Sequence, residues 1–276
     1  MSRRDVAHCM NVELERQGNG NKFVTVNCAV EESKIASRDC GKLLSHDKFI
    51  RDHITKNDIL VVSMGGNDIA LSINPFTICN MLGLICCTTT SCIANCSCGC
   101  DIPVACSNPC CCGGSCVGCL SNACAWPYGL GYFIHLFKTK IQDVLARIVD
   151  KQLPKVIAVC MIYYPSEDTD GSWADRVLGI LGYNKNPSKL QHLISHIFVL
   201  ATQKIKIPGT TVIGIPLFKV LNGKTFSDYE QRVEPSATGG EKMAQIILSE
   251  LGPFLSGSYQ GSPVVGETSA VVMGDR

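Results

Sequence analysis

Four short runs of apolar, mostly β-branched residues punctuate the chain, and they constrain its fold more than any other feature. They are Phe23–Val26, Ile59–Val62, Val156–Ile162 and Thr211–Ile215. Continuous apolar runs of this length are typical of strands that are buried on both faces, as in a parallel sheet. The sequence therefore predicts a buried parallel sheet.

Helical patterns separate and follow these runs. Apolar residues recur at the spacing i, i+3, i+4, i+7 over 141–148 and 190–197, and a last amphipathic pattern covers 243–251. Alternating strands and helices predict an α/β fold with helices on both faces of the sheet. The chain has 276 residues, 46% of them hydrophobic, which is enough for one domain over 1–255 with an insertion.

Two segments fall outside this plan. Residues 79–124, which follow the second strand, hold fourteen of the eighteen cysteines. Residues 256–276 are rich in Ser, Gly and Val and have little periodicity. We expect a Cys-rich insertion at the first segment and a flexible tail at the second.

Charge and hydropathy argue against several classes of partner and location. The net charge is +1 and there is no block of basic residues, so no nucleic-acid partner is expected. The N-terminus has no apolar stretch typical of a secretory signal, and no clear membrane-spanning segment follows. A cytoplasmic location with reduced cysteines is expected.

The turn after the second strand is the first candidate site. It reads Gly65-Gly66-Asn67-Asp68. Ligands of open parallel sheets bind beyond the carboxyl ends of the strands, glycines allow close backbone approach, and an Asn amide can donate to an oxyanion. The alternative is a plain strand-ending turn, in which Gly and Asn are also common.

Two blocks resemble those of the SGNH/GDSL hydrolases. The run Asp58–Asp68 is similar to their Gly-x-Asn-Asp block, and Arg232–Ala244 is similar to their last block. The resemblance implies a flavodoxin-like parallel sheet and hydrolysis of a small ester or acyl substrate without a required cofactor. It makes Asn67 the oxyanion-hole residue, with Gly65 and Gly66 shaping the turn.

The chain departs from the family pattern at the nucleophile and at the second oxyanion position. Family members carry their serine in a Gly-Asp-Ser turn after the first strand, and this chain has neither Gly-Asp-Ser nor an apolar strand before residue 20. We expect that first strand to be missing through truncation. Glu32 stands where an oxyanion glycine is expected, and its carboxylate would oppose a forming oxyanion.

The third departure concerns the general base. Glu234 occupies the position of the family histidine, and a carboxylate is a poor base unless burial raises its pKa. Its alternative role is a structural ion pair or cap. Four further residues are candidates for a pocket wall, with packing roles as the alternative: Tyr163, Tyr164, Asp228 and Arg232. The resulting expectation is a hydrolase-type domain that is catalytically impaired in this form, while an esterase using Glu234 as its base stays open.

The cysteines offer a different class of function. Seven of them have spacings that could hold zinc: Cys96, Cys98, Cys100, Cys110, Cys112, Cys116 and Cys119. The chain would then be a non-enzymatic binding or metal-handling protein. Acylation of clustered cysteines would instead tether the insertion to a membrane, and an unstructured loop is the third alternative.

Overall fold

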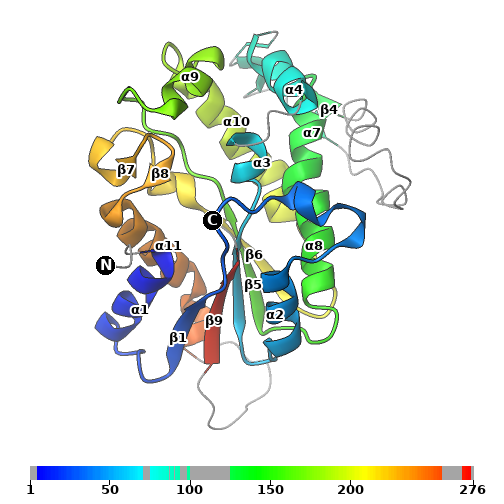
Figure 1. Ribbon diagram of the computed structural model, residues 1–276, viewed down its shortest axis with the longest axis vertical. Helices are drawn as coiled ribbons and strands as arrows, with labels where there is room; N and C mark the ends of the chain where they lie inside the picture. The colour runs from blue at the N-terminus through cyan, green and yellow to red at the C-terminus, as the bar shows by residue number, and fades with distance from the viewer. Residues whose placement is uncertain are drawn as a thin grey trace.

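Five parallel strands form the central sheet, in the order β1-β9-β2-β5-β6 (Figure 1). Their bounds are Phe23–Asn27 for β1, Ser269–Gly274 for β9, Ile59–Ser63 for β2, Val156–Met161 for β5 and Thr211–Pro216 for β6. All four neighbouring pairs are parallel. This computed structural model describes residues 5–70, 75–86, 88–89, 91–93, 98–99, 125–256 and 269–274.

Helices cover both faces of the sheet, because side chains of a strand alternate between its faces. On β2, Ile59 and Val61 belong to the core beneath α1 (Val6–Arg16) and α11 (Ala237–Leu255). Leu60 and Val62 belong to the core on the opposite face. The helices that contribute to that second core include α2 (Ser45–His53), α7 (Leu130–Ile134), α8 (Ile141–Ile148) and α10 (Pro187–Leu200).

The remaining elements lie between these helices and strands in the sequence. Those that precede β5 in the sequence are η1 (Ile35–Gly41), α3 (Gly66–Ala70), α4 (Pro75–Cys86), β3 (Cys98–Gly99), β4 (Ala125–Trp126) and η3 (His135–Lys140). Those after β5 are α9 (Trp173–Ile180), η4 (Thr202–Lys204), η5 (Leu217–Lys219), η6 (Phe226–Asp228), β7 (Tyr229–Glu230) and β8 (Glu234–Pro235). No helix among the described residues is long and apolar enough to cross a membrane.

The parallel sheet, its four expected strands and the three expected helices are confirmed. The tail differs from the expectation at one point: Ser269–Gly274 is not loose but forms β9, inside the sheet. Alternating backbone hydrogen bonds to two neighbours hold a strand even where the sequence shows little periodicity. Residues 257–268 and much of the Cys-rich insertion lie outside the described residues.

Candidate functional site

The turn that follows β2 is shaped by Gly65. Its φ of +98° lies in the left-handed region that favours glycine. A Cβ at this position would come within 2.7 Å of Cε1 of Phe137, a ring that is 1% exposed. Backbone conformation and lack of space therefore both require glycine here, and this turn directs α3 over the carboxyl ends of the strands (Figure 1).

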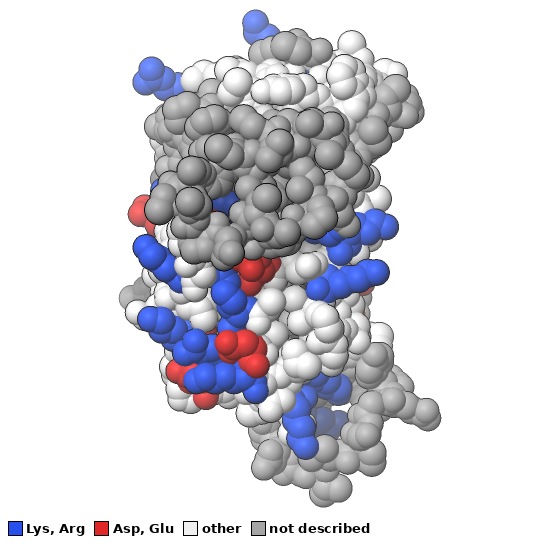
Figure 2. All heavy atoms as spheres, turned by 90° about the vertical axis from the view of Figure 1, so that its right-hand side faces the viewer, with Lys and Arg blue, Asp and Glu red and all other residues white. Residues whose placement is uncertain are grey.

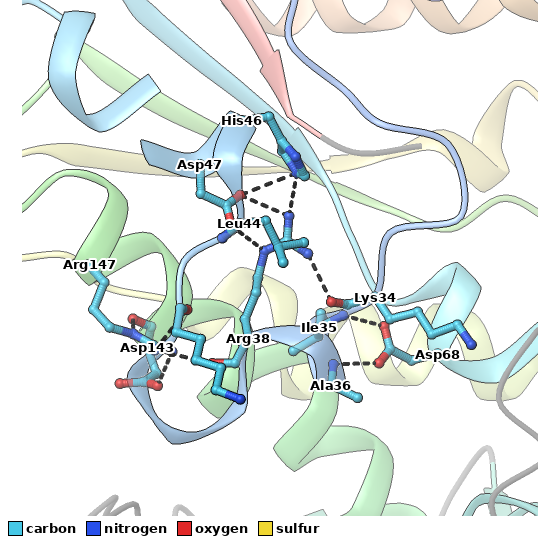
Figure 3. A network of polar contacts seen from close by, with 11 residues as sticks. Lys34, Ile35, Ala36, Arg38, Leu44, His46, Asp47, Asp68, Asp143 and Arg147 are labelled. Carbon is cyan, nitrogen blue, oxygen red and sulfur yellow. Dashed lines mark hydrogen bonds and ion pairs between the residues drawn. The ribbon is translucent and has the colours of Figure 1, made fainter. Parts of the chain in front are cut away.

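Asn67 and Asp68 of α3 bind the loop that follows β1. The side-chain amide of Asn67 donates to the carbonyl of Ser33 at 3.0 Å. The Asp68 carboxylate accepts from the backbone N–H groups of Ile35 at 2.8 Å and Ala36 at 2.9 Å (Figure 3). The turn after β2 thus fixes the loop that follows Glu32, the residue at the position of the expected oxyanion glycine. An oxyanion role needs the Asn67 amide to donate to a substrate oxygen as well as, or in place of, Ser33.

Burial sets the electrostatics of this turn. Asp68 is 5% exposed, and its loss of solvent raises the pKa of the carboxyl above its usual value. The hydrogen bonds from Ala36 and Ile35 and the positive charges of Lys140 and Arg38 act in the opposite direction but do not cancel the effect of burial. Asp68 therefore binds the backbone of the loop although burial disfavours its charged form.

A buried ion pair, which the sequence did not predict, fixes the far end of the same loop. Arg38 forms two hydrogen bonds of 2.8 Å with the Asp47 carboxylate and a third, of 2.9 Å, with the carbonyl of Lys34 (Figure 3). Asp47 also accepts from the backbone N–H of Leu44. No sequence pattern distinguishes this arginine and aspartate from surface charges, because their burial depends on packing against α8.

Glu32, the residue in place of the oxyanion glycine, is exposed and has a φ of +60°. It precedes Ser33, whose carbonyl accepts from Asn67. The left-handed conformation is the one that a glycine at this point would adopt without strain. Glu32 is therefore adjacent in the sequence to the residue that Asn67 binds.

The carboxyl end of β5 connects this turn with the loop that carries Glu234. The place of a Cβ on Gly66 is 3.6 Å from Cγ2 of Ile162. The next residue, Tyr163, donates its hydroxyl to the carbonyl of Val233 at 2.6 Å. Asn67 and Glu234 consequently lie at the same edge of the sheet, on either side of the end of β5, and Figure 1 shows α3 and β8 above that edge.

Glu234 itself is half-buried and belongs to a two-residue antiparallel pair. It lies opposite Glu230 of β7 in the register of that pair. Arg232, two residues before it, has a φ of +65° and turns into the protein, where it binds Asp175. The placement of Glu234 leaves its role as a base a prediction.

Two of the four pocket candidates are enclosed by protein. Arg232 is 0% exposed and binds Asp175 at 2.7 Å, Asn184 at 2.8 Å and the carbonyl of Ser166. Asp228 is 1% exposed and forms an ion pair of 2.6 Å with Lys242. Neither side chain lines an open pocket here, because each is surrounded by its partners.

Tyr163, Tyr164 and Tyr229 connect the loops at the carboxyl end of β5 through hydrogen bonds and ring contacts. The Tyr229 hydroxyl, which the sequence analysis did not single out, donates to the carbonyl of Tyr164 at 2.8 Å. The Tyr164 ring stacks on Phe218 with 5.3 Å between centroids, and burial raises the pKa of its hydroxyl. Tyr163 and Tyr164 thus hold the loops at the end of β5, and both remain half-buried beside the candidate site.

Two hollows lie elsewhere on the described surface. One, of about 140 Å³, lies between α1 and α11, and the other, of about 500 Å³, lies between the η1–α2 loop and α8. The second is lined by Lys42, Lys48, Arg51 and Arg147, together with Asp150. Figure 2 shows that basic and acidic side chains are interleaved on this face. Nearby carboxylates pair with two of the cations, as in Arg51–Asp52 and Arg147–Asp143.

The zinc hypothesis concerns residues that are mostly outside the described part of the chain. Of the seven cysteines named for it, only Cys98 is described, as part of β3. Within the described ranges, no three His, Cys, Asp or Glu side chains are grouped as metal ligands. The zinc and acylation hypotheses therefore remain predictions.

Comparison with known proteins adds no relative. No protein-family model matches the chain, and neither a curated protein nor a solved structure matches it. The function of this chain is therefore inferred from the residues of the site.

Proposed function

We propose that this chain is an SGNH-hydrolase-type domain that is catalytically impaired in its present form. The intact reaction of such a site is hydrolysis of a small carboxylic ester, by transfer of the acyl group to a serine and then to water. One observation carries the proposal: the Gly65–Asp68 turn lies at the carboxyl edge of the sheet, and its Asn67 and Asp68 side chains hold the loop at Ser33–Ala36. Ligands of open parallel sheets bind at this edge.

The retained part of the chemistry is stabilisation of charge. In acyl transfer, negative charge develops on the carbonyl oxygen of the substrate, and a fixed amide donor at that position lowers the barrier. Asn67 is fixed by its contact with Ser33 at the edge where the ester carbonyl would bind. The backbone of the adjacent loop, next to Glu32, would supply a second donor.

The impaired part is the generation of the nucleophile. The chain has no Gly-Asp-Ser, and Glu234 replaces the histidine that would remove the serine proton. A carboxylate is a much weaker base than imidazole at neutral pH. Without an activated hydroxyl, the site would bind an ester without turning it over.

Hydrolysis of short and medium acyl p-nitrophenyl esters tests this proposal. The full chain, Asn67→Ala and the control Asn57→Ala, which lies in the turn before β2 at the opposite edge, are compared under reducing conditions. We expect no protein-dependent turnover from any of the three. Turnover that falls by about 10²–10³ in Asn67→Ala alone would refute the impairment but support the site. Measurable protein-dependent turnover that is equal in all three would overturn the site assignment.

A further inference from the structure

The last strand of the chain lies inside the sheet. β9 pairs in parallel with β1 over five residues, from Phe23↔Ser269 to Asn27↔Met273. On its other side it pairs with β2 over four residues, from Ile59↔Val271 to Val62↔Gly274. A strand with two neighbours is an integral part of the sheet, and without it β1 would have no partner strand in this sheet.

The strand order then has a simple explanation. If β9 is counted as the first strand, the order β1-β9-β2-β5-β6 becomes 2-1-3-4-5, which is that of flavodoxin-like sheets. We infer that the chain is a circular permutant of this topology: its C-terminal segment supplies the strand that an unpermuted chain would form first.

The two ends of the described chain meet where this inference requires. Asn27, at the carboxyl end of β1, donates its side-chain amide to the Asp5 carboxylate at 2.8 Å. The same residue is the register partner of Met273 at the end of β9. Asp5 and Met273 therefore flank Asn27 at the carboxyl edge. A peptide bond between Arg276 and Met1 would leave six residues between Gly274 and Asp5, a reach of about 20 Å when extended.

The connection from α11 to β9, which the unpermuted topology lacks, lies at the amino-terminal edge of the sheet. Lys155, which directly precedes β5, donates its ammonium group to the carbonyl of Phe254 near the end of α11 at 2.6 Å. β9 begins at the same edge, since Ser269 pairs with Phe23 at the start of β1. Residues 257–268 therefore join the end of α11 to the start of β9.

The permutation deepens the proposed function, on which this consequence rests. On the family plan, the nucleophile turn follows the first strand, and here that strand is β9. In the sequence Gly274 is followed by Asp275 and Arg276, two residues outside the described part of the chain. The impairment is then a replacement of serine by arginine in a Gly-Asp-Arg run that follows β9 in the sequence.

Hydrogen exchange on the unaltered chain tests the strand directly. The amides of 269–274 and those of β2 are expected to exchange on the order of 10²-fold or more slowly than unstructured peptide. Exchange of these amides at the unstructured rate, while β2 and β5 are protected, would overturn the inference. Val272→Pro removes a donor from the strand between Val26 and Leu60 and should lower the melting temperature by about 10 °C.

A reordered chain tests the topology. It begins at Ser269, runs through Arg276 directly into Met1 and ends at Ser256. The inference predicts the same circular dichroism spectrum and the same protected amides as in the present chain. A reordered chain that fails to fold, together with unprotected amides at 269–274, would overturn the permutation. Neither result bears on Asn67, so failure of the permutation and failure of the ester site are distinguishable.

Discussion

The guanidinium of Arg38 and the carboxylate of Asp47 form a bidentate ion pair whose side chains are 0% and 1% exposed. Arg38 also binds the carbonyl of Lys34, and Asp68 binds the backbone of Ile35 and Ala36 in the same loop (Figure 3). The candidate site is therefore held by interactions buried beneath it, so its shape depends on the stability of this loop.

Arg38→Met should remove the pair and leave the Asp47 carboxylate buried without its charge partner. The expected loss in the free energy of unfolding is about 3–5 kcal/mol, because a buried charge without a partner is strongly unfavourable. Urea unfolding measures it. Arg51→Met breaks the surface pair with Asp52 and serves as the control, with an expected loss below about 1 kcal/mol. Equal losses would show that the Arg38 pair is not buried as described.

Gly65→Ala should destabilise the protein more than the same change at a glycine with similar backbone conformation and free space. Gly18 has a φ of +73° and nothing within 4 Å of the Cβ position, so Gly18→Ala should cost only the backbone strain, about 1 kcal/mol. At Gly65 the clash with buried Phe137 should add about 1–3 kcal/mol. Thermal unfolding of the two variants side by side checks this, and a larger loss at Gly18 would contradict it.

Protonation of His135 should destabilise the fold in acid. Burial, followed by the positive charge of Lys140, lowers the pKa of His135 to about 4, although Asp39 acts in the opposite direction. The unfolded chain takes up this proton near pH 6.5. The free energy of unfolding is therefore unaffected by protonation of His135 above pH 6.5, and it decreases as the pH falls from 6.5 towards 4.

The size of the effect can be isolated with His135→Gln, which does not titrate. Between pH 7 and pH 4.5, the stability of the original chain should fall by about 2 kcal/mol more than that of the variant. Urea unfolding at both pH values measures the difference, with the exposed His192→Gln as the control. A His135→Gln chain that loses as much stability as the original would rule out this histidine as the source.

Tyr163→Phe should loosen the connection between β5 and the loop before Glu234. It removes the hydroxyl that donates to Val233 and should cost about 1 kcal/mol, because the carbonyl loses its partner. Tyr128→Phe, at a ring that is 50% exposed, is the matched control and should change stability little. Hydrogen exchange should quicken around Val233 in the first variant only. Unchanged exchange there would contradict the bracing role.

The sequence predicts most of the sheet because strands buried on both faces leave continuous apolar runs, as in Ile59–Val62 and Val156–Ile162. It does not predict β9. The apolar part of that strand is only Ala270–Met273, it follows a stretch rich in Gly and Ser, and its two neighbours are more than two hundred residues away in the sequence. Pairing over such a separation leaves no local pattern.

The sequence likewise predicts some features of the candidate site and not others. Turn chemistry and resemblance indicate Gly65 and Asn67, because these residue types are local requirements. The contacts with Ser33 and Phe137, and the enclosure of Arg232, depend on elements distant in the sequence and were not predicted. Residue type alone therefore indicated a site but not how it is held.

Binding of an ester at Asn67 is the most direct test of the account. Isotope-labelled protein is titrated with a short alkyl ester such as ethyl butyrate, and the NMR signals of the Asn67 side-chain amide and of the backbone amides at 65–68 are followed. We expect saturable shifts at these signals and at the loop 32–36, and their loss from the loop in Asn67→Ala. Shifts confined to other regions, or none up to the solubility of the ester, would contradict the proposal that this turn is an acyl-ester site.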